Sequence, residues 1–260
     1  MEIIDTHCHL THGRLRNRLE AVLAGARQAG LVALITAGTD VADSALAQAL
    51  ARDHEGVFFT AGVHPHEAKA AGEDYLRRVE QLASAPRNVA IGEIGLDYHY
   101  DFSPRQVQRR VFAEQLELAR RLDKPVVVHT RDAFEETLAI LANSGLPGER
   151  VVFHSFTGDA DQARRIMELG AYVGFSGIAT FKKAEAVRRA AALVGAERIL
   201  LETDSPYLAP EPVRKQKVNT PANVVHVAGC LAEVRGTSAE AFARQTTDNA
   251  VRFFGLDMPA

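Results

Sequence analysis

The sequence predicts an α/β protein, a single (β/α)8 TIM barrel with parallel strands and extra C-terminal helices. Eight short apolar segments alternate with helical patterns along the chain, as parallel strands and their crossover helices do. The length of 260 residues suits one such barrel, which usually needs about 250 residues. A doubly wound open sheet is the alternative, but the Gly-rich phosphate turn that it would usually carry after an early strand is not present in the sequence.

The predicted strands are short runs of β-branched and other apolar residues. An unbroken run such as residues 31–36 is typical of a strand that is covered on both faces. The strands are expected at residues 2–4, 31–36, 57–63, 89–95, 125–129, 151–154, 172–175 and 199–202.

The predicted helices fill the intervals between these strands. The helix after the fourth strand should begin at Ser103 and Pro104, because serine is a good N-cap and proline is favoured in the first turn. The helices are expected at residues 19–30, 41–54, 74–84, 103–122, 132–142, 159–169 and 184–194, with C-terminal helical segments at 222–234, 239–245 and 248–254. With no linker-like stretch between them, residues 1–260 are predicted to form one domain.

Composition and charge exclude several classes of protein. A net charge of −3 does not suit a protein that coats nucleic acid by bulk electrostatics. The two cysteines, Cys8 and Cys230, form no disulfide-scaffold pattern, which favours a reducing cytoplasm. Neither a signal peptide nor a run of about 18 apolar residues is found in the sequence, so no membrane association is expected. A monomer or a weak oligomer is expected.

Histidine and carboxylate residues recur where the predicted strands end. His7 and His9 follow the first strand at positions i and i+2, so an extended chain would point both imidazoles to one side. The other candidates at strand ends are His64, Glu93, His129, His154 and Asp204. In a parallel barrel, the C-terminal ends of the strands form the active-site face. Buried carboxylates and imidazoles that converge there call for a cation.

Two divalent metal ions would use these ligands. We expect His7, His9 and Asp204 on one ion and His129 and His154 on the other, with Glu93 between them. The mixed nitrogen and oxygen donors suit Zn, Mn, Co or Ni somewhat better than Mg. Taken singly, each of these four histidines and two carboxylates could instead have an ordinary structural role, but six such coincidences at one rim are not expected.

At these residues the sequence resembles the TatD family of metal-dependent deoxyribonucleases, within the amidohydrolase-like barrels. The resemblance covers nearly the whole chain, and the segments around Glu93 and Asp204 are its most specific parts. The matching segments are Asp5-Thr6-His7-Cys8-His9, Gly62-Val63-His64-Pro65, Gly92-Glu93-Ile94-Gly95-Leu96-Asp97, Val128-His129, His154-Ser155-Phe156-Thr157-Gly158, Phe175-Ser176-Gly177, Leu201-Glu202-Thr203-Asp204-Ser205-Pro206-Tyr207-Leu208 and Asn219-Thr220-Pro221.

This resemblance implies a divalent-metal-dependent hydrolase that cleaves phosphodiester bonds in DNA, often as a 3′-5′ exonuclease. It implies metal-ligand roles for the six residues assigned above and a substrate-side role for His64. The partner would be nucleic acid, namely single-stranded DNA or DNA ends. A metal-dependent ester hydrolase such as a D-aminoacyl-tRNA deacylase is the alternative, since it would share every metal residue.

Catalytic and binding roles follow for some of these residues. Asp204 is the candidate general base for an activated water, and a protonated His64 could donate to a phosphate oxygen or the leaving group. The basic residues Arg214, Lys215 and Lys217 could bind flanking phosphates, although a solvated loop explains them equally simply.

Two further classes are disfavoured. Cyclic-amide and phosphotriester hydrolases often bridge their metals with a carboxylated lysine, and residues 89–95 contain Glu93 but no lysine. A barrel that binds a partner and uses metal only structurally would not need the spare imidazoles, because structural sites are usually closed.

Overall fold

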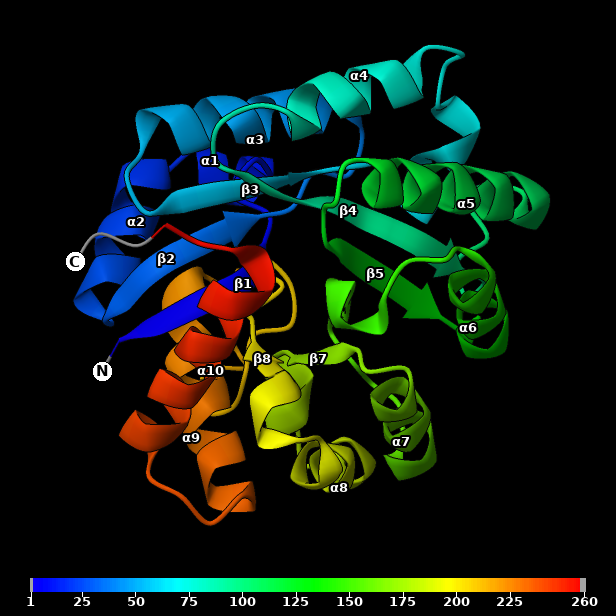
Figure 1. Cartoon of the computed structure of the whole chain (residues 1–260). Helices are drawn as coiled ribbons and strands as arrows, with labels where there is room; N and C mark the ends of the chain where they lie inside the picture. The colour runs from blue at the N-terminus through cyan, green and yellow to red at the C-terminus, as the bar shows by residue number, and fades with distance from the viewer. Residues whose placement is uncertain (1, 258–260) are drawn as a thin grey trace. The chain divides into compact units, whose positions relative to one another are not determined.

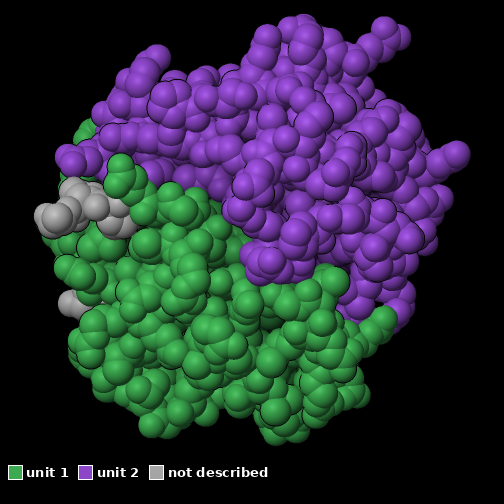
Figure 2. All heavy atoms as spheres, in the orientation of Figure 1, with its two compact units in different colours: residues 1–36, 154–260 green, residues 37–153 purple. Residues whose placement is uncertain are grey.

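The computed structural model describes residues 2–257; Met1 and residues 258–260, the ends of the predicted domain, lie outside the described residues. The chain divides into two compact units (Figure 2). Unit 1 comprises Met1–Thr36 and His154–Ala260, and unit 2 comprises Ala37–Phe153. That residues 1–260 form one domain stays a prediction.

Eight parallel strands form one sheet in the order of the chain, within the described residues (Figure 1). The strands of unit 1 are β1 (Ile3–Cys8), β2 (Leu31–Thr36), β7 (Tyr172–Phe175) and β8 (Ile199–Leu201). Those of unit 2 are β3 (Val57–Ala61), β4 (Asn88–Asp97), β5 (Val126–Arg131) and β6 (Val151–Phe153).

Strands β1 and β8 lie side by side within unit 1, although they stand at opposite ends of the strand order. The hydroxyl of Thr6 donates to the carbonyl oxygen of Leu201 at 3.0 Å, and an isolated parallel bridge joins Cys8 to Ser205. With strands in chain order and a helix after almost every strand, the predicted (β/α)8 TIM-barrel fold is confirmed.

Helices alternate with the strands as the sequence predicts. Unit 1 contains α1 (Gly13–Arg16), α2 (Leu19–Gln28), α7 (Ala160–Glu168), α8 (Glu185–Leu193), α9 (Val224–Val234) and α10 (Ala239–Phe254). Unit 2 contains α3 (Val41–Asp53), α4 (Tyr75–Ala83), α5 (Arg105–Arg121) and α6 (Phe134–Asn143). Short 3-10 turns are η1 (Pro65–Ala70), η2 (Gly148–Arg150), η3 (Gly177–Thr180), η4 (Ala196–Arg198) and η5 (Pro221–Asn223).

Two helix predictions were wrong in detail. Separate helical segments were expected on either side of residues 246–247, but α10 is one continuous helix that ends at Phe254. The hydroxyl of Thr246 donates to the carbonyl of Phe242 within this helix, at 3.0 Å. Ser103 does not cap α5, whose N-cap is Pro104. The Ser103 hydroxyl instead donates to the carbonyl of His66 at 2.8 Å and accepts the amide of Lys69, so it fixes a loop rather than a helix end.

Strand β4 of unit 2 is longer than predicted and is held at both edges. Gly95 pairs with His129 of β5 and has a φ of 142°. A Cβ atom there would lie 1.9 Å from the carbonyl oxygen of His129, so only glycine allows β4 and β5 to pair at this point. On the other side, Gln108 of α5 accepts the amide of Asp97 at 2.8 Å and donates to its carbonyl at 3.0 Å.

Candidate metal centre

The unit 1 cluster comprises five acidic and imidazole side chains that lie at or beyond strand ends. Its members are His7, His9, His154, Glu202 and Asp204. Ligand-type atoms of His7, His9 and Asp204 all lie within 4.8 Å of one another, and so do those of His7, His154 and Glu202. All of these side chains are buried except that of Asp204, which is 15% exposed. His7 is therefore shared between two overlapping triads.

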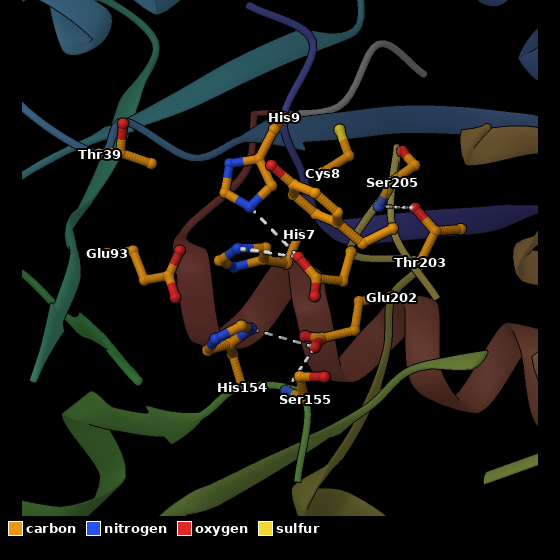
Figure 3. Close-up of polar contacts among 12 residues, drawn as sticks. His7, Cys8, His9, Thr39, Glu93, His154, Ser155, Glu202, Thr203 and Ser205 are labelled. Atoms are coloured by element: carbon orange, nitrogen blue, oxygen red, sulfur yellow. Dashed lines mark hydrogen bonds and ion pairs between the residues drawn. The ribbon is translucent and has the colours of Figure 1, made fainter. Parts of the chain in front are cut away.

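The imidazoles of the unit 1 cluster are arranged around His7 (Figure 3). The rings of His7 and His9 meet edge to face with centroids 5.0 Å apart, and the rings of His7 and His154 stack at 4.0 Å. The Oδ1 atom of Asp204 lies 3.2 Å from Nε2 of His9 and 4.0 Å from Nε2 of His7. The side chains of His9, His154 and Asp204 therefore all lie close to the His7 imidazole.

Backbone hydrogen bonds place Asp204 opposite the two histidines. The amide of Asp204 donates to the carbonyl of His7 at 2.9 Å, and the amide of His9 donates to that of Ser205 at 2.7 Å. Asp204 has a left-handed φ of 54°, which turns the chain as it leaves β8. The two backbone hydrogen bonds therefore hold Asp204 and Ser205 against the end of β1.

Within the unit 1 cluster, Glu202 supports His154. Its Oε1 atom lies 3.4 Å from Nδ1 of His154 and also accepts the amide of Ser155 (Figure 3). A Cβ atom at Gly174 would lie 2.5 Å from Oε2 of Glu202, so a glycine is needed for this carboxylate to fit. A carboxylate against the outer nitrogen of a histidine fixes the ring and raises its strength as a ligand.

The unit 2 cluster consists of His64, Glu93 and His129. His64 follows β3, Glu93 lies within β4, and His129 lies within β5. The Oε1 atom of Glu93 lies 3.0 Å from Nδ1 of His129 and 3.3 Å from Nε2 of His64. Glu93 is 3% exposed. A carboxylate so buried, between two imidazoles, is a strong candidate ligand for a cation.

Asp97 joins the unit 2 cluster to the loop after β4. Its Oδ2 atom lies 3.1 Å from Nε2 of His129 and 2.9 Å from Nε2 of His66, and Oδ1 accepts the amides of His99 and Tyr100. No role was predicted for Asp97 from the sequence. The alternation of Glu93, Gly95 and Asp97 along β4, which puts them on one face, was the signal that could have found it.

Replacing Asp97 with Asn should lower the free energy of unfolding in chelator by about 1–3 kcal/mol at pH 7, because an amide donor would face the histidine donors. Burial opposes ionisation of Asp97, yet hydrogen bonds from His129 and His66 hold its pKa well below the usual range. The wild-type advantage should therefore be full above the unfolded pKa of about 3.9 and shrink as the pH falls below it.

Urea unfolding at several pH values would measure this difference. Asn at the exposed Asp123 is the matched control, expected to change stability by less than about 0.5 kcal/mol. Equal stability of wild type and the Asp97 variant at pH 7 would contradict the role given to Asp97.

Electrostatics separate the candidate residues into charged and neutral groups. Burial works against ionisation of Asp204, but the hydrogen bond and charge of His9, with the charges of His154 and His7, keep its pKa below the usual value. Burial lowers the pKa of His64 to about 4, with Glu93 opposing the shift. His64 is therefore neutral near pH 7, whereas a protonated donor was expected from the sequence.

Burial also raises the pKa of Asp5 to about 8, in spite of hydrogen bonds from Thr203. Asp5 accepts the Thr203 amide at 2.9 Å and its hydroxyl at 2.6 Å, so it holds the residue that precedes Asp204. A positioning residue of this kind lies below the site and was not foreseen from the sequence.

The structure brings some predicted residues together and not others. The predicted group of His7, His9 and Asp204 lies in unit 1, and Glu93 and His129 lie together in unit 2 with His64. The predicted pairing of His129 with His154 joins residues of different units and stays a prediction. Arg214, Lys215 and Lys217 are exposed, and the Arg214 guanidinium lies 3.7 Å from the ring centroid of Phe181.

Buried imidazole and carboxylate groups within ligand distance of one another fit divalent metal ions, which accept mixed nitrogen and oxygen donors. Fold and clusters together define the class: a (β/α)8 barrel with candidate metal centres at the ends of its strands. The model for the TatD-related DNases matches residues 4–255. The chain belongs to the TatD-related DNase family.

Known relatives resemble the chain over its whole length. It is 40% identical over 261 residues to the uncharacterized metal-dependent hydrolase YcfH of Escherichia coli K12, covering 99% of this chain and 97% of that protein. It is 36% identical over 262 residues to the 3′-5′ ssDNA/RNA exonuclease TatD of Enterobacter lignolyticus, covering 98% and 100%. The crystal structure of the TatD homologue YjjV of E. coli K12 superposes with a TM-score of 0.92 at 31% identity, covering 98% of each chain.

Among the residues described, no helix is both long and apolar enough to cross a membrane.

Proposed function

We propose that this protein is a metal-dependent deoxyribonuclease that shortens single-stranded DNA from its 3′ end. The observation that carries the proposal is the pair of buried imidazole and carboxylate clusters, which lie at C-terminal strand ends of a TIM barrel. The family match and a relative named as a 3′-5′ ssDNA/RNA exonuclease support the substrate class.

Two divalent ions, of Zn, Mn, Co, Ni or Mg, would be held by the residues of the two clusters. His7, His9 and Asp204 would hold one ion and His129 and His154 the other, with Glu93 as the shared ligand. When bound, the ions would lower the pKa of the attacking water and stabilise negative charge on the phosphate.

Protein side chains would supply the proton transfers and the positioning. Asp204 is the general base, since its lowered pKa keeps the carboxylate ionised at neutral pH. The Nδ1 atom of His64 accepts the amide of His66 at 3.1 Å, which leaves the proton of the neutral ring on Nε2. This Nε2 atom lies 3.3 Å from Oε1 of Glu93. With Glu93 holding metal, His64 would donate from Nε2 to a phosphate oxygen or the leaving group instead. Glu202 and Asp97 would fix His154 and His129.

Basic side chains after β8 would bind phosphates further along the strand. Arg214, Lys215 and Lys217 are exposed and follow Asp204 within fourteen residues of chain. When binding to single-stranded DNA is measured, log Kobs falls linearly with the logarithm of the salt concentration. Neutralising any one side chain that binds a phosphate should make this slope shallower by about 0.7.

End-labelled single-stranded DNA, incubated with the metal-loaded protein beside D-aminoacyl-tRNA, tests the proposal. DNA should shorten from its 3′ end, and a chelator should abolish the shortening. Deacylation of the tRNA with intact DNA would replace the proposed function by the ester-hydrolase alternative.

Metal binding should be visible without any substrate. At an ion concentration of 100 times Kd, binding of the one ion held by His7, His9 and Asp204 to the folded state should add about 2.7 kcal/mol. For a chain of this size, Tm should then rise by about 5–10 °C over the chelator-treated protein. His9→Ala should remove most of this rise in scanning calorimetry. His226→Ala, on the outer helix α9, should keep it, and equal shifts in the two variants would argue against a site at His9.

A further inference from the structure

The loop between β4 and α5 of unit 2 (Figure 1) contains two residues, Tyr100 and Phe102, whose aromatic rings are exposed. Tyr100 is 47% exposed and Phe102 is 54% exposed, among the few large hydrophobic side chains that reach the surface of the described residues. Their rings stack with centroids 5.2 Å apart and planes 23° from parallel. We call Tyr100, Phe102 and the adjacent Arg131 the aromatic platform.

The aromatic platform is built rigidly rather than left on a loose loop. The Oδ1 atom of Asp97 accepts the amides of His99 and Tyr100, and Gln108 donates to the carbonyls of Asp97 and Ser103. Asp101, which lies between Tyr100 and Phe102 in the chain, has a left-handed φ of 50°. A preorganised surface loses less conformational entropy on binding than a mobile one.

The ring of His66 connects the aromatic platform to the unit 2 cluster. The His66 ring lies edge-on to Phe102 with centroids 4.8 Å apart and to Tyr100 at 5.4 Å. The same His66 ring lies 6.3 Å from the ring of His129, and both rings contact Asp97. The single side chain of His66 thus separates the platform from the candidate metal ligand His129.

Charge at the aromatic platform also suits a nucleotide. The guanidinium of Arg131 lies 4.8 Å from the ring centroid of Tyr100 and is exposed. Within residues 2–257 no carboxylate forms an ion pair with Arg131, whereas Asp101 is bound by Arg105 and Asp132 lies 3.0 Å from His99. Asp101 is therefore paired with Arg105, and Arg131 remains for a phosphate.

We propose that Tyr100 and Phe102 stack against a nucleobase of the substrate strand while Arg131 binds an adjoining phosphate. Stacking on aromatic rings accepts any base, because each base presents a π face. This inference rests on the proposed function and adds the surface that would hold a single strand, in preference to a stacked duplex, beside the scissile bond.

Steady-state kinetics of the metal-loaded protein tests the inference on two substrates. Tyr100→Leu with Phe102→Leu should lower kcat/KM on single-stranded DNA about 10- to 100-fold, mainly through KM. The same double variant should cleave bis(4-nitrophenyl) phosphate, a diester without a nucleobase, as wild type does. Exchanging the rings, Tyr100→Phe with Phe102→Tyr, should keep activity on DNA, and Leu46→Ala, at an exposed residue of α3, is the surface control.

Abasic oligonucleotides locate the stacked base. Moving one abasic site through the last three positions should give one oligonucleotide on which wild type and the leucine variant perform alike. For Arg131→Gln, the slope of log KM against the logarithm of the salt concentration should be shallower by about 0.7 than for wild type.

The outcomes distinguish the inference from the function beneath it. Failure of wild type to cleave DNA overturns the proposed function and the inference with it. Cleavage of DNA by the leucine variant at the wild-type kcat/KM overturns the inference alone, and so does an equal loss on the small diester, which would show a structural role for the rings.

Discussion

Changing Asp204 to Asn should reduce kcat on single-stranded DNA by about 10²- to 10⁴-fold, the usual contribution of a general base. Asparagine keeps an oxygen at Oδ1 and the same shape, so the variant should retain most of its metal. It cannot accept a proton at neutral pH, whereas the Asp204 carboxylate is held ionised by His9 and its neighbours.

Bound metal and turnover should be measured on the same preparation of the Asp204 variant, by atomic emission and by release of nucleotides. Asp248→Asn, on the exposed face of α10, is the matched control and should retain full activity. An unchanged rate in the Asp204 variant would remove this residue as the base, and loss of metal along with the rate would assign it to binding instead.

Strand positions followed from the sequence because buried parallel strands are continuous apolar runs. Residues 31–36 form β2 at the limits that the apolar run predicts. The alternation of His7 and His9 likewise predicted side chains on one side, and their rings lie 5.0 Å apart. Local periodicity is enough for such features, because they depend on neighbours in the chain.

Features that depend on distant partners were not predictable in the same way. Asp97 is buried by its contacts with His66, from η1, and His129, from the neighbouring strand β5. The hydroxyl of Ser103 suggested a helix cap, but its partners are backbone groups of η1, thirty-four or more residues away. Two separate helical segments, 239–245 and 248–254, were expected, yet α10 is continuous and its buried Asn249 donates to the carbonyls of Ala196 and Ile199.

Neutral His64 illustrates how tertiary burial changes a chemical role. From the sequence, this imidazole follows the third predicted strand, and a protonated His64 was the expected donor to a phosphate oxygen or the leaving group. Burial lowers its pKa to about 4, so the neutral ring is the form available near pH 7. The protonation states of His64 and Asp204, and with them their chemical roles, therefore depend on burial and neighbouring groups rather than on residue type.

Removing the Glu93 carboxylate should have the largest effect of all, because Glu93 is proposed to be shared by both ions. Its Oε1 atom lies between His129, at 3.0 Å, and His64, at 3.3 Å, and its side chain is almost wholly buried. In Glu93→Ala the two imidazoles would face a cavity without an anionic ligand. Metal content should fall by at least about half, and kcat should fall by roughly 10³-fold or more.

Titration of the Glu93 variant with metal tests whether the loss comes through binding. Activity should return only partly at high metal concentration, since the shared ligand is missing, and Glu93→Gln should show a smaller loss of metal because the amide oxygen can still coordinate. Glu67→Ala, at an exposed residue of η1 in the same unit, should match wild type in both measurements. Full activity of Glu93→Ala at ordinary metal concentration would show that the two ions do not share this carboxylate, and the proposed ligand assignment would then have to be redrawn around His64 and His129.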